Sequence, residues 1–139
     1  MTFLPEDDRE ELALKAIEYS EIEEPVQNGI VRRAVLFPNF TFEGTLFASD
    51  SGALTPRTQC DLLVVIPAGY ARTKLDSFYT RPHLKRHDGA YPNCAKDLQT
   101  LFNHSWQFWS RHLTDEEWEK SGRDLITYLH IVRDAFRQA

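Results

Sequence analysis

Residues 62–66, Leu-Leu-Val-Val-Ile, constrain the fold of this chain more than any other segment. An unbroken apolar run of this length is typical of a β-strand that is covered on both faces or that lies at the centre of a sheet. Pro67 ends the run, and an extended turn follows through Gly69 and Tyr70. Residues 77–80 then predict a second short strand. The segment therefore predicts a buried central strand joined by this turn to a neighbour.

A short helix is expected before these strands. Pro5 fits the first turn of a helix, and residues 6–8, Glu-Asp-Asp, favour the positive end of the helix dipole. We expect this helix to end near Leu14, and a longer helix through Glu18 stays open as an alternative.

Two further strands follow this helix. The alternation over residues 16–23 and the apolar run over residues 30–37 predict a hairpin with Asn28-Gly29 at its turn. Residues 40–58 are harder to interpret. They are consistent with a short strand at 41–47 followed by a surface loop.

The pattern becomes helical after Cys94. Apolar and aromatic side chains recur every three or four positions over residues 98–109, which predicts a helix. The same spacing is more regular over residues 124–136, and Ser121-Gly122 in front of this second predicted helix supplies a cap. We therefore expect one α+β domain over residues 1–139, with a four-stranded antiparallel meander, a short leading helix and two later helices packed on the sheet. The expected core comprises Val31, Val35, Phe37, Leu63, Val65, Trp106, Leu125, Leu129 and Val132.

Charge and composition disfavour several classes of partner. The chain has 139 residues, a net charge of −5 and a pI of about 5.5, which disfavours nucleic acid. It has no long apolar run and starts with acidic residues, which argues against a membrane span and a secretory signal. The two cysteines lack metal-type spacing, and no glycine-rich phosphate loop occurs, so no metal or cofactor is expected. A cytoplasmic protein with two free thiols fits this pattern best.

Residues 81–87 carry the strongest local basic signal. Arg81, Lys85 and Arg86 lie close to His83 and His87 in the sequence. A solvated loop explains such a cluster, and so does a small docking patch for an acidic protein face. The sequence leaves both interpretations open.

Cys94 is the leading candidate for chemistry. The preceding Pro92 and Asn93 suit an exposed loop, where a thiolate can act as both nucleophile and leaving group. The alternative is a small loop residue packed under Tyr91. Cys60 opens the apolar strand instead, and we expect it to be buried as a small hydrophobic residue.

A second cluster lies in residues 103–112, where His104 and His112 accompany Trp106 and Trp109. On a helix these residues could border a site. Tryptophans at this spacing are more often core residues, and a histidine near a helix end more often interacts with the dipole. The role of this cluster stays open.

Taken together, these segments resemble the ubiquitin-conjugating enzymes. In that family a strand ending in Phe-Pro, a Tyr-Pro turn, a second strand and a His-Pro-Asn tripeptide precede the cysteine that carries ubiquitin. Residues 66–70 (Ile-Pro-Ala-Gly-Tyr), residues 77–80 and Cys94 follow a similar order. The wider pattern is similar to the bacterial relatives classed as prokaryotic family E, and the resemblance covers nearly the whole chain. The further segments that carry it are residues 4–8 (Leu-Pro-Glu-Asp-Asp), residues 106–112 (Trp-Gln-Phe-Trp-Ser-Arg-His), Trp118 and the final helix at residues 124–136.

The chain departs from the family pattern at several points. Arg81-Pro82-His83 stands where the family has His-Pro-Asn, and Ala71 follows Tyr70 where the family has proline. The family asparagine is associated with stabilising the oxyanion that forms when a lysine attacks the thioester. The resemblance therefore implies that Asn93 or His83 substitutes as hydrogen-bond donor.

Two classes of function follow from the resemblance. In the first, Cys94 accepts a ubiquitin-like protein from an activating enzyme as a thioester and passes it to a target, with His83 and Asn93 near the thioester carbonyl. In the second, the domain is a catalytically inactive scaffold that binds the ubiquitin-like protein or its activating enzyme non-covalently. Both imply protein partners rather than nucleic acid, membrane or a small cofactor.

Overall fold

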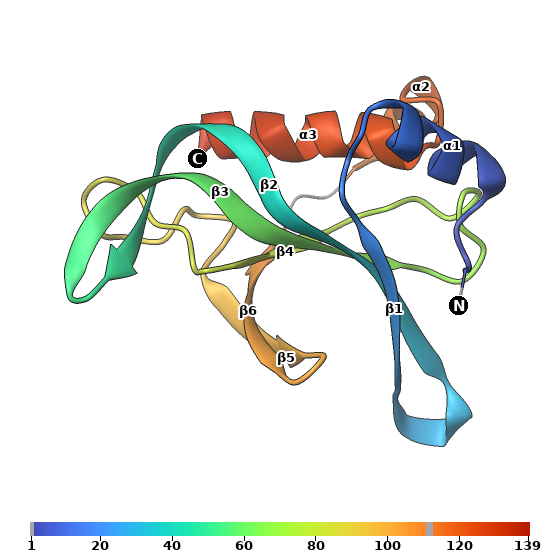
Figure 1. The fold of residues 1–139 in the computed structure, drawn as a ribbon, viewed down its shortest axis with the longest axis horizontal. Coiled ribbons are helices and arrows are strands. Elements are labelled where there is room, and N and C mark those ends of the chain that lie inside the picture. The colour runs from blue at the N-terminus through green and yellow to red at the C-terminus, as the bar shows by residue number, and fades with distance from the viewer. Residues whose placement is uncertain (1, 111–112) are drawn as a thin grey trace.

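The computed structural model describes residues 2–110 and 113–139. These residues form one antiparallel sheet and three α-helices (Figure 1). The six strands lie in the order β1-β2-β3-β4-β6-β5. In chain order the elements are α1 (Glu6–Leu14), β1 (Ser20–Pro25), the 3-10 turn η1 (Gln27–Gly29), β2 (Val31–Asp50), β3 (Ala53–Ile66), β4 (Phe78–Arg81), β5 (Asp97–Leu101), β6 (His104–Trp109), α2 (Asp115–Lys120) and α3 (Leu125–Gln138).

Strands β1 to β4 pair in chain order, each antiparallel to the next. The predicted α+β class is therefore confirmed, as are the leading helix, the turn at Asn28-Gly29 and the final helix. The expected number of strands is wrong, because β6 and β5 extend the sheet beyond β4.

Residues 40–58 form the end of one long hairpin rather than a short strand and a surface loop. β2 and β3 pair from Arg33 with Ile66 at the base to Asp50 with Ala53 near the tip. The register shifts twice along the way, which bends the ribbon. A Cβ atom on Gly44 would lie 2.6 Å from the carbonyl oxygen of Arg57, so only glycine fits where the two backbones meet.

Residues 98–109 form the hairpin of β5 and β6, so the predicted helix at this place is wrong. Phe102 and Asn103 have φ angles of 50° and 64°, the conformation of a two-residue hairpin turn. Trp106 and Trp109 are both buried, but they belong to core clusters on opposite faces of the sheet. Because both faces of β6 are covered, its apolar residues do not alternate, and their spacing resembles that of a helix.

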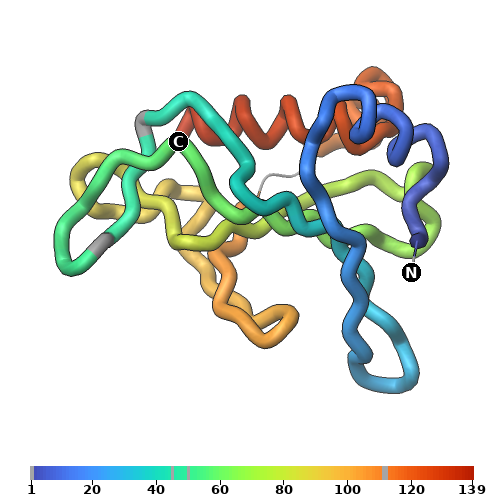
Figure 2. The backbone as a smooth tube through the Cα atoms, viewed as in Figure 1, coloured from blue at the N-terminus to red at the C-terminus, as the bar shows by residue number. Residues whose placement is uncertain are grey.

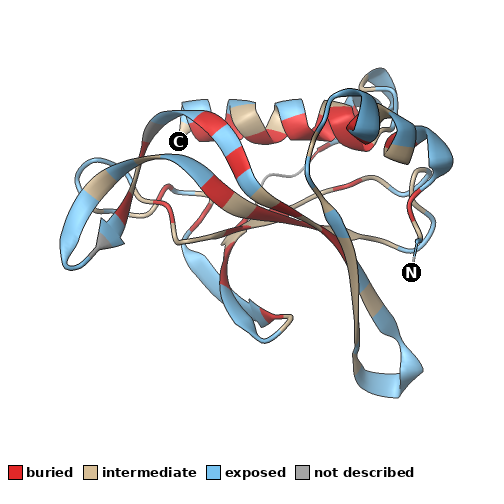
Figure 3. Ribbon diagram, viewed as in Figure 1, coloured by how far each residue is buried: buried red, intermediate tan, exposed pale blue. Residues whose placement is uncertain are grey.

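The main core lies between α3 and the sheet. The buried positions of α3 face the strands (Figure 3). The ring of Phe136 lies 4.7 Å from that of Phe42 and 5.0 Å from that of Trp109. Two core predictions fail: Val65 is only half-buried, and Val31 is 46% exposed because it pairs with Pro25 at the far end of the first hairpin. The predicted core residues that are buried are Val35, Phe37, Leu63, Trp106, Leu125, Leu129 and Val132.

A smaller core forms on the other face of the sheet. It consists of Ala34, Leu63, Leu101 and Trp106. The hairpins β1–β2 and β5–β6 both project on this side (Figure 2), and the two ends of the sheet meet where the Phe102 amide donates to a Glu24 carboxylate oxygen at 3.0 Å. The sheet is therefore strongly curled.

Asp8 fixes the leading helix to the rest of the fold. Its carboxylate is 3% exposed and accepts hydrogen bonds from the Tyr70 hydroxyl at 2.7 Å and from the Leu125 amide at 3.3 Å. Burial raises the pKa of Asp8, and the two hydrogen bonds oppose this effect. Within the described ranges, no helix has the length and apolar character needed to span a membrane.

Candidate functional site

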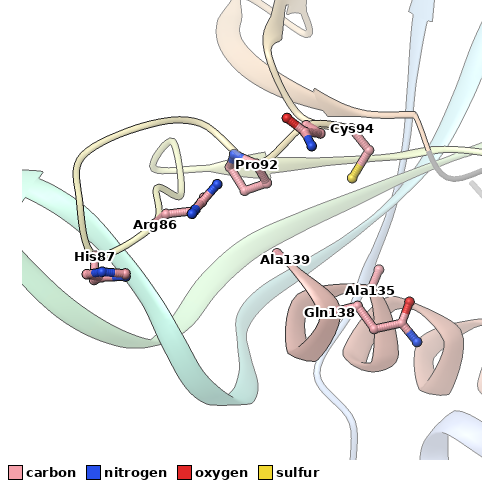
Figure 4. Close-up of a pocket in the computed structure, with 8 residues that line it drawn as sticks. Arg86, His87, Pro92, Cys94, Ala135, Gln138 and Ala139 are labelled. Carbon is pink, nitrogen blue, oxygen red and sulfur yellow. The ribbon is translucent and has the colours of Figure 1, made fainter.

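Cys94 lies in the loop between β4 and β5, opposite the C-terminal end of α3. It is half-buried, packs against the main core and lines a pocket of about 510 Å³. Figure 4 shows its sulfur atom pointing toward the last turns of α3, which carry Ala135 and Gln138. The pocket therefore gives access to one side of the thiol while the core supports the other. The remaining lining residues are Arg86, His87, Pro92, Asn93 and Ala139.

Backbone hydrogen bonds hold the Cys94 loop on both sides of the thiol. The carbonyl oxygen of Cys94 accepts from the Ser110 amide at 2.7 Å, and the Ala95 amide donates to the Pro92 carbonyl at 2.9 Å. Ser110 follows β6 directly. The strand β6, for which the sequence predicted a helix, therefore positions the candidate nucleophile.

Gln107 of β6 ties this loop to its neighbour. Its amide group is fully buried and donates to the Leu84 carbonyl at 2.8 Å and the Ala95 carbonyl at 3.0 Å. Its carbonyl oxygen accepts from the Leu84 amide at 2.7 Å and the Thr80 hydroxyl at 2.9 Å. All the hydrogen-bonding capacity of the side chain is therefore used to hold the residues beside His83 and Cys94. The sequence analysis missed this residue, since a single glutamine carries no local signal.

Asn93 shares the pocket with Cys94, as expected, and its side chain is exposed. Arg86 and His87 line the same pocket from the preceding loop, and the side chain of Arg86 reaches toward Pro92 (Figure 4). Arg86 also forms a 3.7 Å ion pair with Asp88. One pocket is thus lined by the thiol of Cys94, the side-chain amide of Asn93, the guanidinium group of Arg86 and the imidazole ring of His87.

His83 does not lie in this pocket, so the structure does not bring it together with Cys94 and Asn93 as expected. It lines a separate cavity that includes Lys85 and Tyr91, and its Nε2 lies 3.5 Å from the Ser105 hydroxyl. Burial, aided by the nearby charge of Lys85, lowers the pKa of His83, so its ring is predominantly neutral near pH 7.

The other sequence candidates have simpler places. Cys60 is buried, as predicted, and burial raises the pKa of its thiol, which makes it a poor nucleophile. His104 is exposed at the start of β6, and Trp106 and Trp109 are core residues. His112 lies outside the described residues. Within those residues, no group of His, Cys, Asp and Glu side chains is arranged to hold a metal ion.

Comparison with known proteins identifies the family of the chain. No curated protein and no solved structure matches the chain significantly. A family model described as "Prokaryotic E2 family E" matches residues 4–139, nearly the whole chain, including both loops of the site. Its name refers to E2 enzymes, and membership suggests a role in ubiquitin-like protein conjugation. The chain therefore belongs to prokaryotic E2 family E.

Proposed function

We propose that this protein is a carrier in a ubiquitin-like conjugation pathway, with Cys94 as the acceptor thiol. The observation that carries this proposal is the position of Cys94: half-buried, at the edge of a pocket, on a loop held by hydrogen bonds from Ser110 and Gln107. A nucleophile needs both access and a fixed position. Cys60 has no access, so Cys94 is the better candidate.

The first step is a thioester exchange. The Cys94 thiolate attacks the carbonyl of the thioester that joins the ubiquitin-like protein to the activating enzyme. The new C–S bond forms, the old one breaks, and the thiolate of the activating enzyme leaves. In the second step a nucleophile of the target attacks the Cys94 thioester, and the Cys94 thiolate leaves.

Asn93 is the proposed hydrogen-bond donor to the oxyanion that develops in each step. Its exposed amide sits beside Cys94 in the same pocket, and a donor aimed at this oxygen typically contributes a factor of about 10² to 10³ in rate. His83, which lines the neighbouring cavity, is not assigned contact with the thioester.

Reconstitution with the matching activating enzyme, ATP and ubiquitin-like protein tests the proposal. Wild-type protein should form a conjugate that a thiol reductant releases. Cys94→Ala should abolish the conjugate, and Cys60→Ala, the matched control for loss of a thiol, should retain it.

Two other results would redirect the assignment. A conjugate that resists thiol reductant but yields to hydroxylamine would implicate an oxyester on a serine such as Ser105 or Ser110. Non-covalent binding with no conjugate would instead favour an inactive scaffold that holds the ubiquitin-like protein or the activating enzyme.

A further inference from the structure

A second cavity lies next to the Cys94 site and has a basic character. We call it the Lys85 pocket; it has a volume of about 290 Å³ and is lined by Ser49, Arg81, Pro82, His83, Lys85 and Tyr91. The chain as a whole is acidic, with a net charge of −5, and the first turns of α1 and α2 carry three acidic residues each. The Lys85 pocket is therefore an exception to the general charge of the molecule.

Lys85 is the cation in this pocket that is available to a ligand. Its ammonium group lies 5.5 Å from the centre of the Tyr91 ring and 3.3 Å from the Ser49 hydroxyl. Of the carboxylates whose side chains the structure describes, none pairs with it. Arg81, by contrast, forms an ion pair with Asp61 at 3.3 Å and lies over the ring of Trp106.

The backbone of Lys85 is fixed, although its side chain has no acidic partner among the described residues. Its amide and carbonyl form two hydrogen bonds with Phe47 of β2, at 2.7 and 2.8 Å. The predominantly neutral ring of His83 beside it adds polar atoms without adding charge. A ligand that fits the Lys85 pocket carries a carboxylate, which can accept hydrogen bonds from an ammonium group and from hydroxyl groups.

The location of the pocket relates it to the thiol. Tyr91 lines the Lys85 pocket and Cys94 lines the neighbouring one, and the two residues are three positions apart. Their Cα atoms are therefore separated by no more than about 11 Å, the span of roughly three extended residues. A polypeptide joined to Cys94 through its terminal carbonyl can reach the Lys85 pocket with its last few residues.

We propose that the Lys85 pocket binds an acidic side chain in the C-terminal tail of the ubiquitin-like protein that Cys94 carries. This inference rests on the proposed function. The tail is the favoured occupant because it is tethered beside the pocket for the whole life of the thioester, whereas the activating enzyme and the target are present only during transfer.

Peptide thioesters test this without the activating enzyme. Three peptides would end in Gly-Gly as the thioester of the neutral thiol N-acetylcysteamine and carry Glu, Gln or Lys four residues before the end. Exchange onto Cys94, in which its thiolate displaces N-acetylcysteamine thiolate, is followed by mass spectrometry. Wild-type protein should react about fivefold faster with the Glu peptide than with the Gln peptide, the scale expected for one partly buried ion pair, and added salt should reduce this ratio.

Variants at Lys85 and at a control lysine decide the assignment. Lys85→Met should remove the preference for Glu, and Lys85→Glu should transfer it to the Lys peptide. Lys96→Met, a matched control at an exposed lysine two residues after Cys94, should keep the preference for Glu. Equal rates for the Glu and Gln peptides on the wild-type protein, or an unchanged preference in Lys85→Met, would overturn the inference.

A binding measurement separates failure of the pocket from failure of the proposed function. The same peptides as free acids are titrated onto fluorescently labelled Cys94→Ser protein. Tighter binding of the Glu peptide, lost in the Lys85→Met double variant, supports the pocket even if no peptide exchanges onto Cys94. Equal binding of all three peptides overturns the inference, even if Cys94 does exchange.

Discussion

Replacing Gln107 by leucine should loosen the Cys94 loop as well as destabilise the fold. Leucine has a similar size but cannot form the four hydrogen bonds of the buried amide. Three backbone groups, the Leu84 amide and the carbonyls of Leu84 and Ala95, would lose this partner. At about 1 kcal/mol each, the lower end of the cost of an unsatisfied buried group, the loss is about 3 kcal/mol in the free energy of unfolding.

Two measurements test this expectation. Denaturant unfolding gives the loss of stability, and Gln59→Leu, at an exposed glutamine of β3, is the matched control that should change stability by less than about 0.5 kcal/mol. The rate at which iodoacetamide alkylates Cys94 in native buffer reports on the loop, and it should rise in Gln107→Leu but not in Gln59→Leu. A loss below about 1 kcal/mol together with an unchanged alkylation rate would show that Gln107 does not hold the loop.

Three further predictions concern the scaffold. Leu129→Ala should cost about 2–5 kcal/mol in denaturant unfolding because Leu129 is 1% exposed, whereas a loss below about 0.5 kcal/mol would contradict its place in the core. Gly44→Ala should lower stability by about 1–3 kcal/mol because the new methyl group would overlap the Arg57 carbonyl, and an unchanged midpoint of unfolding would refute that close approach. Burial raises the pKa of Asp8, so the folded state binds more protons than the unfolded state as the pH rises above about 4. The free energy of unfolding of the wild-type protein should therefore fall with rising pH relative to that of Asp8→Asn. Parallel profiles of unfolding free energy against pH for the two proteins would contradict this.

The sequence predicted best those elements whose signals are local. Pro5 and the acids after it mark the start of α1, and the apolar face over residues 124–136 marks α3. Thr114 and Glu117 form a capping box at the start of α2, which is also a local signature of a helix start.

The hairpin of β5 and β6 could not be predicted from the same rules. Its turn places Phe102 at a positive φ angle, where asparagine or glycine is usual, so the turn carried only a weak signal. Burial of β6 on both faces removed the alternation that identifies most antiparallel strands. Strong curling of the sheet, which a linear pattern does not encode, is the physical cause.

The site shows the same division. The sequence predicted Cys94 and Asn93 as candidates because the loop residues around them are typical of exposed turns and resemble a known family, and both residues line one pocket. It grouped His83 with them, although the chain places His83 in the Lys85 pocket. The supporting role of Gln107 depends on contacts between residues up to 23 positions apart, which only the folded arrangement brings together.

The central claim, that Cys94 carries the ubiquitin-like protein, is tested most directly by changing the atom that forms the bond. Intact-mass measurement would follow the Cys94→Ser variant after incubation with the activating enzyme, ATP and the ubiquitin-like protein. We predict an adduct that now resists thiol reductant, because an oxyester replaces the thioester, and that maps to position 94 after proteolysis. An adduct on this variant that the reductant still releases would place the cargo on Cys60 and contradict the account.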